Sequence, residues 1–139
     1  MSNKIIIIII VHLFFGLNNM YSQNRTFAQK SNDNAIDLIM VGKYKDALVE
    51  INRALKIEPN NANYYYVRGN AYQGLNELTK AIDNYKLTLV KNPRHTDAIM
   101  KCGIVYGKLN DKKSACKYFI LACNYGEQKG CEISNKFCN

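Results

Sequence analysis

The sequence contains no tryptophan and only two prolines, and none of its five cysteines lies before residue 102. With two prolines and eight glycines, it has little capacity for the many turns of an all-β sandwich. Acidic residues are also few, so the net charge is +8. The hydrophobic share of 47% and the charged share of 22% exclude a disordered or collagen-like chain. The 139 residues correspond to one small, basic, globular domain.

The sequence also lacks the residue sets that enzymes and metal sites need. Its only histidines are His12 and His95, which is too few for a convincing Ser/His/Asp arrangement. It has no GxSxG, no phosphate-binding glycine loop, no HExxH and no CxxC pair. We therefore expect no enzymatic activity, no cofactor and no bound metal.

The N-terminal segment has the pattern of a secretory signal peptide. Lys4 precedes a run of 13 mostly apolar residues, from Ile5 to Leu17, and the small Ser22 marks a candidate cleavage point. A full membrane span needs roughly 18 apolar residues. We therefore predict that residues 1–22 are a signal peptide and that the protein is exported, periplasmic or secreted, without a lipoprotein cysteine. Two alternatives stay open, an uncleaved anchor, because Met20 is large for its place, and a buried strand.

The rest of the chain repeats with a period of 34 residues. The columns that align are Ala47, Ala81 and Ala115; Ala35, Gly69 and Gly103; Ile51, Tyr85 and Phe119; Gly42, Asn76 and Asn110; and Pro59 and Pro93. Small residues let helix backbones approach, and large ones fill the adjacent space. Gly and Asn tolerate left-handed turns, and each proline ends a helix. The pattern predicts paired helices near 26–41, 44–57, 62–75, 78–91, 96–109 and 112–125, with a seventh near 128–138.

This pattern resembles the tetratricopeptide repeat (TPR), a helix–turn–helix unit of 34 residues. The resemblance covers three units, 28–61, 62–95 and 96–129, and is best in the second. There, Tyr65, Gly69, Tyr72, Ala81, Tyr85 and Pro93 match the family pattern, whereas Arg68 replaces the usual leucine. The resemblance implies an all-α fold, a right-handed α-solenoid of three TPR-like units over 23–127 with a C-terminal capping helix at 128–139. A generic helical bundle is the alternative.

Four of the cysteines are spaced so that two helices can be joined twice. Cys116 and Cys123 are seven residues apart on one helix, and Cys131 and Cys138 are seven apart on the next. One antiparallel register brings both pairs together, so we predict the disulfides Cys116–Cys138 and Cys123–Cys131. The spacing of the inner pair also resembles that of secreted cysteine-rich relatives of this repeat. Cys102 is expected to be a buried free thiol, with an intermolecular bridge or exchange of partners as alternatives.

The resemblance further implies that the first helices of the units line a concave peptide-binding groove. The corresponding positions are Asn32, Asp33, Ile36, Tyr66, Asn70, Gln73, Met100, Lys101, Ile104 and Lys108. Tyr66 is expected to stack on a peptide, and Asn70 and Gln73 to hold its backbone amides. Lys101 and Lys108 favour an acidic partner. Solvated groove walls are the alternative. The chaperone-tail carboxylate clamp of the family is not matched, because its positions hold Asn32, Ile36, Val67, Asp97 and Lys101, of which only Lys101 fits.

These features together predict a non-enzymatic protein–protein interaction module, a small exported adaptor that binds a peptide or partner helix. The alternative is a membrane-tethered structural or envelope-surface protein with an uncleaved N-terminal segment. Self-association is also open, because three units are near the minimum for a stable array. Nucleic acid is not an expected partner of an exported protein. The lysines near the C-terminus suit an anionic envelope surface or simple solvation; they are Lys112, Lys113, Lys117, Lys129 and Lys136.

Overall fold

A computed structural model describes residues 3–138, which form seven α-helices and no strand. The helices are α1 (Asn3–Met40), α2 (Tyr44–Ile57), α3 (Ala62–Gly74), α4 (Leu78–Lys91), α5 (Thr96–Lys108), α6 (Lys112–Asn124) and α7 (Gln128–Phe137). Met1 and Ser2 of the predicted signal peptide, and Asn139 of the predicted cap, lie outside the described residues. The all-α expectation is confirmed, and the predicted helix boundaries agree within one residue, except at the start of α1.

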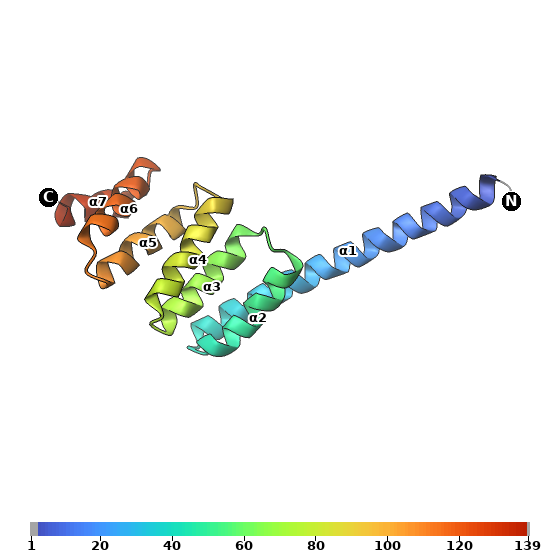
Figure 1. Cartoon of the computed structure of the whole chain (residues 1–139), viewed down its shortest axis with the longest axis horizontal. Coiled ribbons are helices and arrows are strands. Elements are labelled where there is room, and N and C mark those ends of the chain that lie inside the picture. Colours follow the sequence, from blue (N-terminus) through green and yellow to red (C-terminus); the bar gives the residue numbers. More distant parts are fainter. Residues whose placement is uncertain (1–2, 139) are drawn as a thin grey trace.

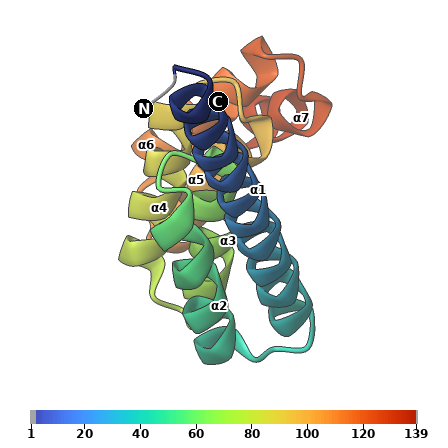
Figure 2. The same ribbon diagram turned by 90° about the vertical axis from the view of Figure 1, so that its right-hand side faces the viewer.

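The helices pack as successive antiparallel pairs that stack side by side (Figure 1). The helix α1 pairs with α2, α3 with α4, and α5 with α6, while α2 contacts α3 and α4 contacts α5. The helices α1 and α7 lie at opposite ends of the stack (Figure 1). A view toward the N-terminal end shows the later pairs behind α1 and α2 (Figure 2). This arrangement is an α-solenoid of TPR-like units.

The tight turns share one backbone structure. Gly42, Asn76, Asn110 and Gly126 have φ angles of 76°, 59°, 60° and 88°. In the second unit, the Asn76 N–H donates to the Gln73 carbonyl at 3.0 Å, and the Glu77 N–H donates to the Tyr72 carbonyl at 2.9 Å. The other three turns repeat both hydrogen bonds, which define the Schellman motif. The left-handed turns expected from the 34-residue column are confirmed.

The glycine and aromatic columns meet inside each unit. A Cβ atom added to Gly69 would lie 2.6 Å from the Tyr85 ring, and one added to Gly103 would lie 2.6 Å from the Phe119 ring. The alanines of the neighbouring column, Ala47, Ala81 and Ala115, have no exposed surface. The predicted close approach of the two helices of a unit is therefore confirmed.

The first part of α1 projects from the solenoid as an arm, which we define as residues 3–22 (Figure 1). The large apolar side chains described between Ile6 and Leu17 are 45–71% exposed. This arrangement contradicts the buried-strand alternative, because the segment is helical and solvated. Ala28 is the first buried residue of the described chain, so the candidate cleavage point after Ser22 precedes the core. Within residues 3–138, no helix has the length and hydropathy to cross a membrane.

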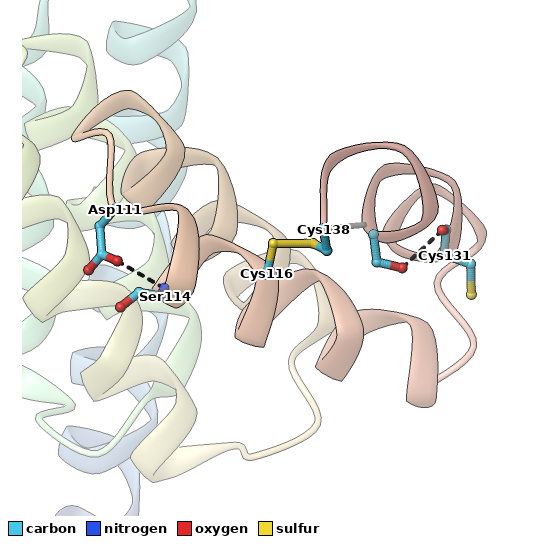
Figure 3. Close-up of a disulfide and its surroundings, with 6 residues drawn as sticks. Asp111, Ser114, Cys116, Cys131 and Cys138 are labelled. Carbon is cyan, nitrogen blue, oxygen red and sulfur yellow. Dashed lines mark hydrogen bonds between the residues drawn. A yellow bond between two sulfur atoms is a disulfide. The ribbon is translucent and has the colours of Figure 1, made fainter.

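The C-terminal helix α7 lies antiparallel to α6 and is bonded to it at two points. Disulfides join Cys116 to Cys138 and Cys123 to Cys131, with Cα atoms 5.6 Å and 4.5 Å apart. Figure 3 shows the first of these bridging α6 and the C-terminal end of α7. These are the two pairs that the antiparallel register predicts. The turn at Gly126 is of the kind used within a unit, so α7 folds back on α6 as a further hairpin.

Candidate functional site

The structure distributes the predicted groove residues between buried and open positions. Asn32 is only 1% exposed, so its side chain does not line the open groove. Asp33 is exposed and accepts hydrogen bonds from Gln29 Nε2 at 2.9 Å and Asn32 Nδ2 at 3.2 Å. The remaining positions are exposed or half-buried; they are Ile36, Tyr66, Asn70, Gln73, Met100, Lys101, Ile104 and Lys108.

Four of these residues meet around one depression of about 390 Å³, which we call the donor hollow. Its lining consists of Ile39, Tyr44, Asn70, Gln73, Gly74, Lys101 and Lys108. Helices α1, α3 and α5 all contribute, so every unit supplies a wall. Asn70, Gln73, Lys101 and Lys108 come from the predicted set. The other predicted residues do not line this depression.

Three residues that line the hollow were not among those predicted from the sequence. Ile39 falls in the same repeat column as Gln73, and Gly74 falls in the column of Lys108, so the 34-residue period contains the signal for both. Tyr44 begins α2, a second helix of a unit, and the groove pattern gives no signal for it. The Tyr44 ring lies against Gly74, where an added Cβ would overlap it. The floor of the hollow is therefore apolar.

A buried tyrosine behind the groove fixes the two amides. Tyr85 on α4 has no exposed surface, and its hydroxyl lies 2.9 Å from Asn70 Oδ1 and 2.7 Å from Gln73 Oε1. Burial raises the pKa of Tyr85 above its usual range, so the hydroxyl keeps its hydrogen and shares it between the two oxygens. Asn70 and Gln73 consequently present amide N–H groups to a ligand. Such groups hold carbonyl or carboxylate oxygens, whereas the backbone N–H of a peptide needs an acceptor.

Tyr66 is part of a packed aromatic group. Its ring centroid lies 4.8 Å from that of His95 and 5.8 Å from that of Tyr85. His95 is itself fixed, because its Nδ1 accepts a hydrogen bond from the Ala98 N–H at the start of α5, at 3.3 Å. Burial raises the pKa of Tyr66, and Asn70 hydrogen-bonds its hydroxyl. The ring is thus held by its neighbours and is only half-buried.

The charge of the donor hollow is positive and unbalanced. Lys101 and Lys108 stand seven residues apart on α5, about 10 Å along the helix axis and on the same face. Neither lysine forms an ion pair with a carboxylate of residues 3–138; the ion pairs are Arg25–Glu58, Arg53–Glu50 and Lys80–Glu77. No acidic side chain lines the hollow. Its lining side chains therefore carry two positive charges and no negative charge, which favours an anionic ligand.

Cys102 is the free thiol and has no exposed surface. Burial raises its pKa to about 12, although Lys86 and the Tyr118 hydroxyl act in the opposite direction. A nucleophilic cysteine needs a low pKa and access to solvent, and Cys102 has neither. Across the described part of the chain, no three His, Cys, Asp or Glu side chains lie together as a metal site.

Known proteins resemble this chain in part of its sequence and in most of its fold. Residues 41–76 match a family model described as a TPR repeat. The mouse protein named tetratricopeptide repeat protein 14 is 34% identical over 76 residues, which is 55% of this chain and 10% of the mouse protein. The chain therefore spans only about a tenth of that relative.

Two solved structures give the fold more completely. The TPR domain of Arabidopsis OM64 has a TM-score of 0.76 at 19% identity and covers 81% of this chain and 94% of that one. The first TPR of Spaghetti (RPAP3), bound to the HSP90 peptide SRMEEVD, has a TM-score of 0.76 at 18% identity, with coverage of 82% and 92%. The chain is thus an α-solenoid with the fold of TPR domains. TPR domains are protein-interaction modules and are generally not enzymes.

Proposed function

We propose that this protein is a non-enzymatic adaptor that binds an extended peptide of a partner protein in its concave groove. The observation that carries the proposal is the donor hollow, because helices from all three units build it and its two lysines form no ion pair among residues 3–138. The solved Spaghetti domain, which shares the fold, is bound to a peptide. That complex supports a peptide as the kind of ligand.

The test is a comparison of groove and control variants against a displayed peptide library. The full chain is held in a nonionic detergent that covers the apolar arm. Selected peptides are measured on the wild type, on Tyr66→Ala/Lys101→Glu, and on Lys113→Glu/Lys117→Glu, a charge change on α6 outside the groove. We expect at least about a tenfold loss in the groove variant, the range for a removed charged hydrogen bond, and little change in the control.

The proposal fails if no peptide distinguishes the wild type from the groove variant. Because Tyr66 packs on Tyr85 and His95, circular dichroism melting checks that each variant is folded. The single variant Lys101→Glu, in which the aromatic group is intact, gives the same comparison without a packing change.

We also propose that the adaptor acts outside the cytosol after loss of its N-terminal segment. The support is the signal-peptide pattern of residues 1–22 and the two disulfides, which persist in oxidising compartments. The core starts at Ala28, so cleavage after Ser22 removes no buried side chain of the described chain. N-terminal sequencing of the protein from its native compartment is expected to begin at Gln23.

The alternative is a membrane-tethered protein that keeps the segment, and one observation favours it. The arm and the first helix of the solenoid form one continuous helix, α1, so a retained arm holds the solenoid rigidly at the membrane surface. Its apolar run of 13 residues is about 20 Å long, less than the roughly 30 Å hydrocarbon core. If N-terminal sequencing finds Met1 and the protein sediments with membranes, the tethered form is correct and the cleaved form is not.

A further inference from the structure

We propose that the donor hollow is a subsite for side-chain carboxylates of an acidic partner segment, and that Tyr85 is the positioning residue behind its selectivity. This inference rests on the proposed function and names the chemistry of the peptide. Tyr85 does not line the hollow. It acts through the amides of Asn70 and Gln73.

The first step is the orientation of the amides. The oxygen and nitrogen of a side-chain amide share one carbon, so an oxygen fixed toward Tyr85 fixes the N–H₂ group away from it. Asn70 is held from two sides, since it also hydrogen-bonds the Tyr66 hydroxyl. Gln73 has one described anchor, the Tyr85 hydroxyl, so its nitrogen is available to the hollow.

The second step is the charge and the hydrogen-bonding character of the polar side chains in the lining. The polar lining consists of the two oriented amides, the Lys101 and Lys108 ammonium groups, and the Tyr44 hydroxyl. Four of these five groups present only hydrogen-bond donors to the hollow, the Tyr44 hydroxyl can donate and accept, and none is a carboxylate. A carboxylate accepts hydrogen bonds only and carries the complementary charge. The side chains that line the hollow thus offer no charged acceptor to a lysine or amide side chain.

The third step is shape. Tyr44, packed on Gly74, and Ile39 give the hollow an apolar floor, which suits the methylene groups of a glutamate. The distance of about 10 Å along α5 between Lys101 and Lys108 equals about three residues of an extended chain. The site differs from the chaperone-tail clamp, since of the clamp positions only Lys101 lines the hollow. It takes side-chain carboxylates, and a chain terminus is not required.

The probe is a fluorescein-labelled oligoglutamate of about ten residues with an amidated C-terminus, long enough to exceed the lysine spacing. The matched neutral probe is oligoglutamine of the same length. Anisotropy titrations use the full chain in nonionic detergent. We expect oligoglutamate to bind at least about tenfold more tightly than oligoglutamine. The same oligoglutamate with a free C-terminus is expected to bind no better.

The lysines are tested with Lys101→Met/Lys108→Met, which is expected to weaken oligoglutamate binding by about tenfold or more. Lys113→Met/Lys117→Met makes the same charge change on α6 and is expected to alter it by less than about twofold. Equal losses in both variants would show a diffuse charge effect and overturn the subsite.

Tyr85 is tested with Tyr85→Phe, which keeps the ring against Gly69 but removes the hydroxyl that fixes both amides. We expect the ratio of oligoglutamate to oligoglutamine affinity to fall by about threefold to tenfold. A purely structural role would lower the melting temperature and both affinities while the ratio stayed constant, which overturns the positioning role. In the converse variant, Gln73→Glu, a carboxylate replaces the amide, and the ratio is expected to fall further.

The two proposals fail in different ways. If library peptides bind the groove, yet oligoglutamate shows no preference over oligoglutamine, the proposed function stands and this inference is wrong. If every peptide binds the wild type and the groove variants equally well, the proposed function fails, and the carboxylate subsite that rests on it fails as well.

Discussion

At the scale of single residues, Arg68 shows how this chain departs from its repeat. Where the family usually buries a leucine, Arg68 donates from Nε to Asn84 Oδ1 at 2.7 Å and from Nη1 to Asn52 Oδ1 at 3.0 Å. Its guanidinium also lies 5.3 Å from the centre of the Tyr65 ring. A side chain on α3 thus joins α2 and α4 by hydrogen bonds, so a polar network does part of the work of apolar packing at this crossing.

Residue positions were predictable where the repeat alone defines them. The contacts of Gly69 with Tyr85 and of Gly103 with Phe119 follow from columns that recur every 34 residues. The orientation of Asn70 and Gln73 does not, because it depends on a hydroxyl from another helix. Asn32 was assigned to the groove from its column, but its side chain is only 1% exposed, because α1 packs against both α2 and α3.

The tight crossing at Gly103 gives a prediction with a control in the same helix. Gly103→Ala places a Cβ 2.6 Å from the Phe119 ring, so we expect the free energy of unfolding to fall by about 1–3 kcal/mol. Gly107→Ala, also in α5, meets no atom within 4 Å and is expected to leave stability unchanged or to raise it by up to about 1 kcal/mol. Urea denaturation measures both. Equal losses would show that the effect is not the crossing.

At the scale of elements, the helix boundaries could be predicted from nearby glycine, asparagine and proline residues. The start of α1 could not be predicted in this way. The helices α2 and α4 end at Ile57 and Lys91, just before Pro59 and Pro93, as proline requires. The start of α1 was predicted near residue 26 because the apolar run was treated as a separate segment. Between Leu17 and Gly42, however, the sequence has no glycine or proline to break a helix, so the helix continues through both parts.

The two disulfides between α6 and α7 give a prediction that is measured by counting reactive thiols. Iodoacetamide at pH 8 is expected to leave the native protein unmodified, because Cys102 is buried with a pKa of about 12 and the other four cysteines are bonded. Denaturation without reductant should expose one reactive thiol, and denaturation with reductant five. Intact mass spectrometry reads both numbers. Three or five reactive thiols before reduction would contradict the two-disulfide cap.

The disulfides and Cys102 also predict how the free energy of unfolding changes with reduction and with pH. Reduction of the folded protein should lower the free energy of unfolding, by about 2.5–3.5 kcal/mol for each bridge and less than additively, because one loop lies within the other. The folded pKa of Cys102 lies above its ordinary value of 9.0. Its contribution to stability is therefore fully present below pH 9 and is lost as the pH rises toward 12.

At the scale of the whole molecule, the arm projects from the solenoid and adds none of its described side chains to the buried core. The buried residues form clusters within and between the units, beginning at Ala28, and the arm contributes none of them. Each unit packs on its neighbours alone, as in other repeat proteins. The number of units and their order were predictable from the period, whereas the direction of the arm was not, because no repeat column includes it.

The separation predicts different outcomes for two deletions. Removal of residues 1–22 is expected to leave the free energy of unfolding within about 0.5 kcal/mol of the full chain, as for a solvated surface change. Removal of residues 1–34 deletes buried Ala28, Ser31 and Asn32, and about half of the first helix of the first unit no longer pairs with α2. In circular dichroism, that variant should lose helical signal at 222 nm and show a lower melting temperature than the full chain. A large loss of stability in the shorter deletion would contradict the separation.

The turn at Gly126 constrains how such an array changes length in evolution. Repeat arrays lengthen when a unit is copied and the copy is inserted through a linker between units, which Pro59 and Pro93 mark here. After α6 the chain uses a within-unit turn, and Gly130 lies so close to Ala122 that the two backbones nearly touch. A unit copied directly behind α6 would separate all four bonded cysteines from their partners. Duplication of 28–61 or 62–95 would leave α6 and α7 adjacent, so only a unit copied before α6 keeps both disulfides.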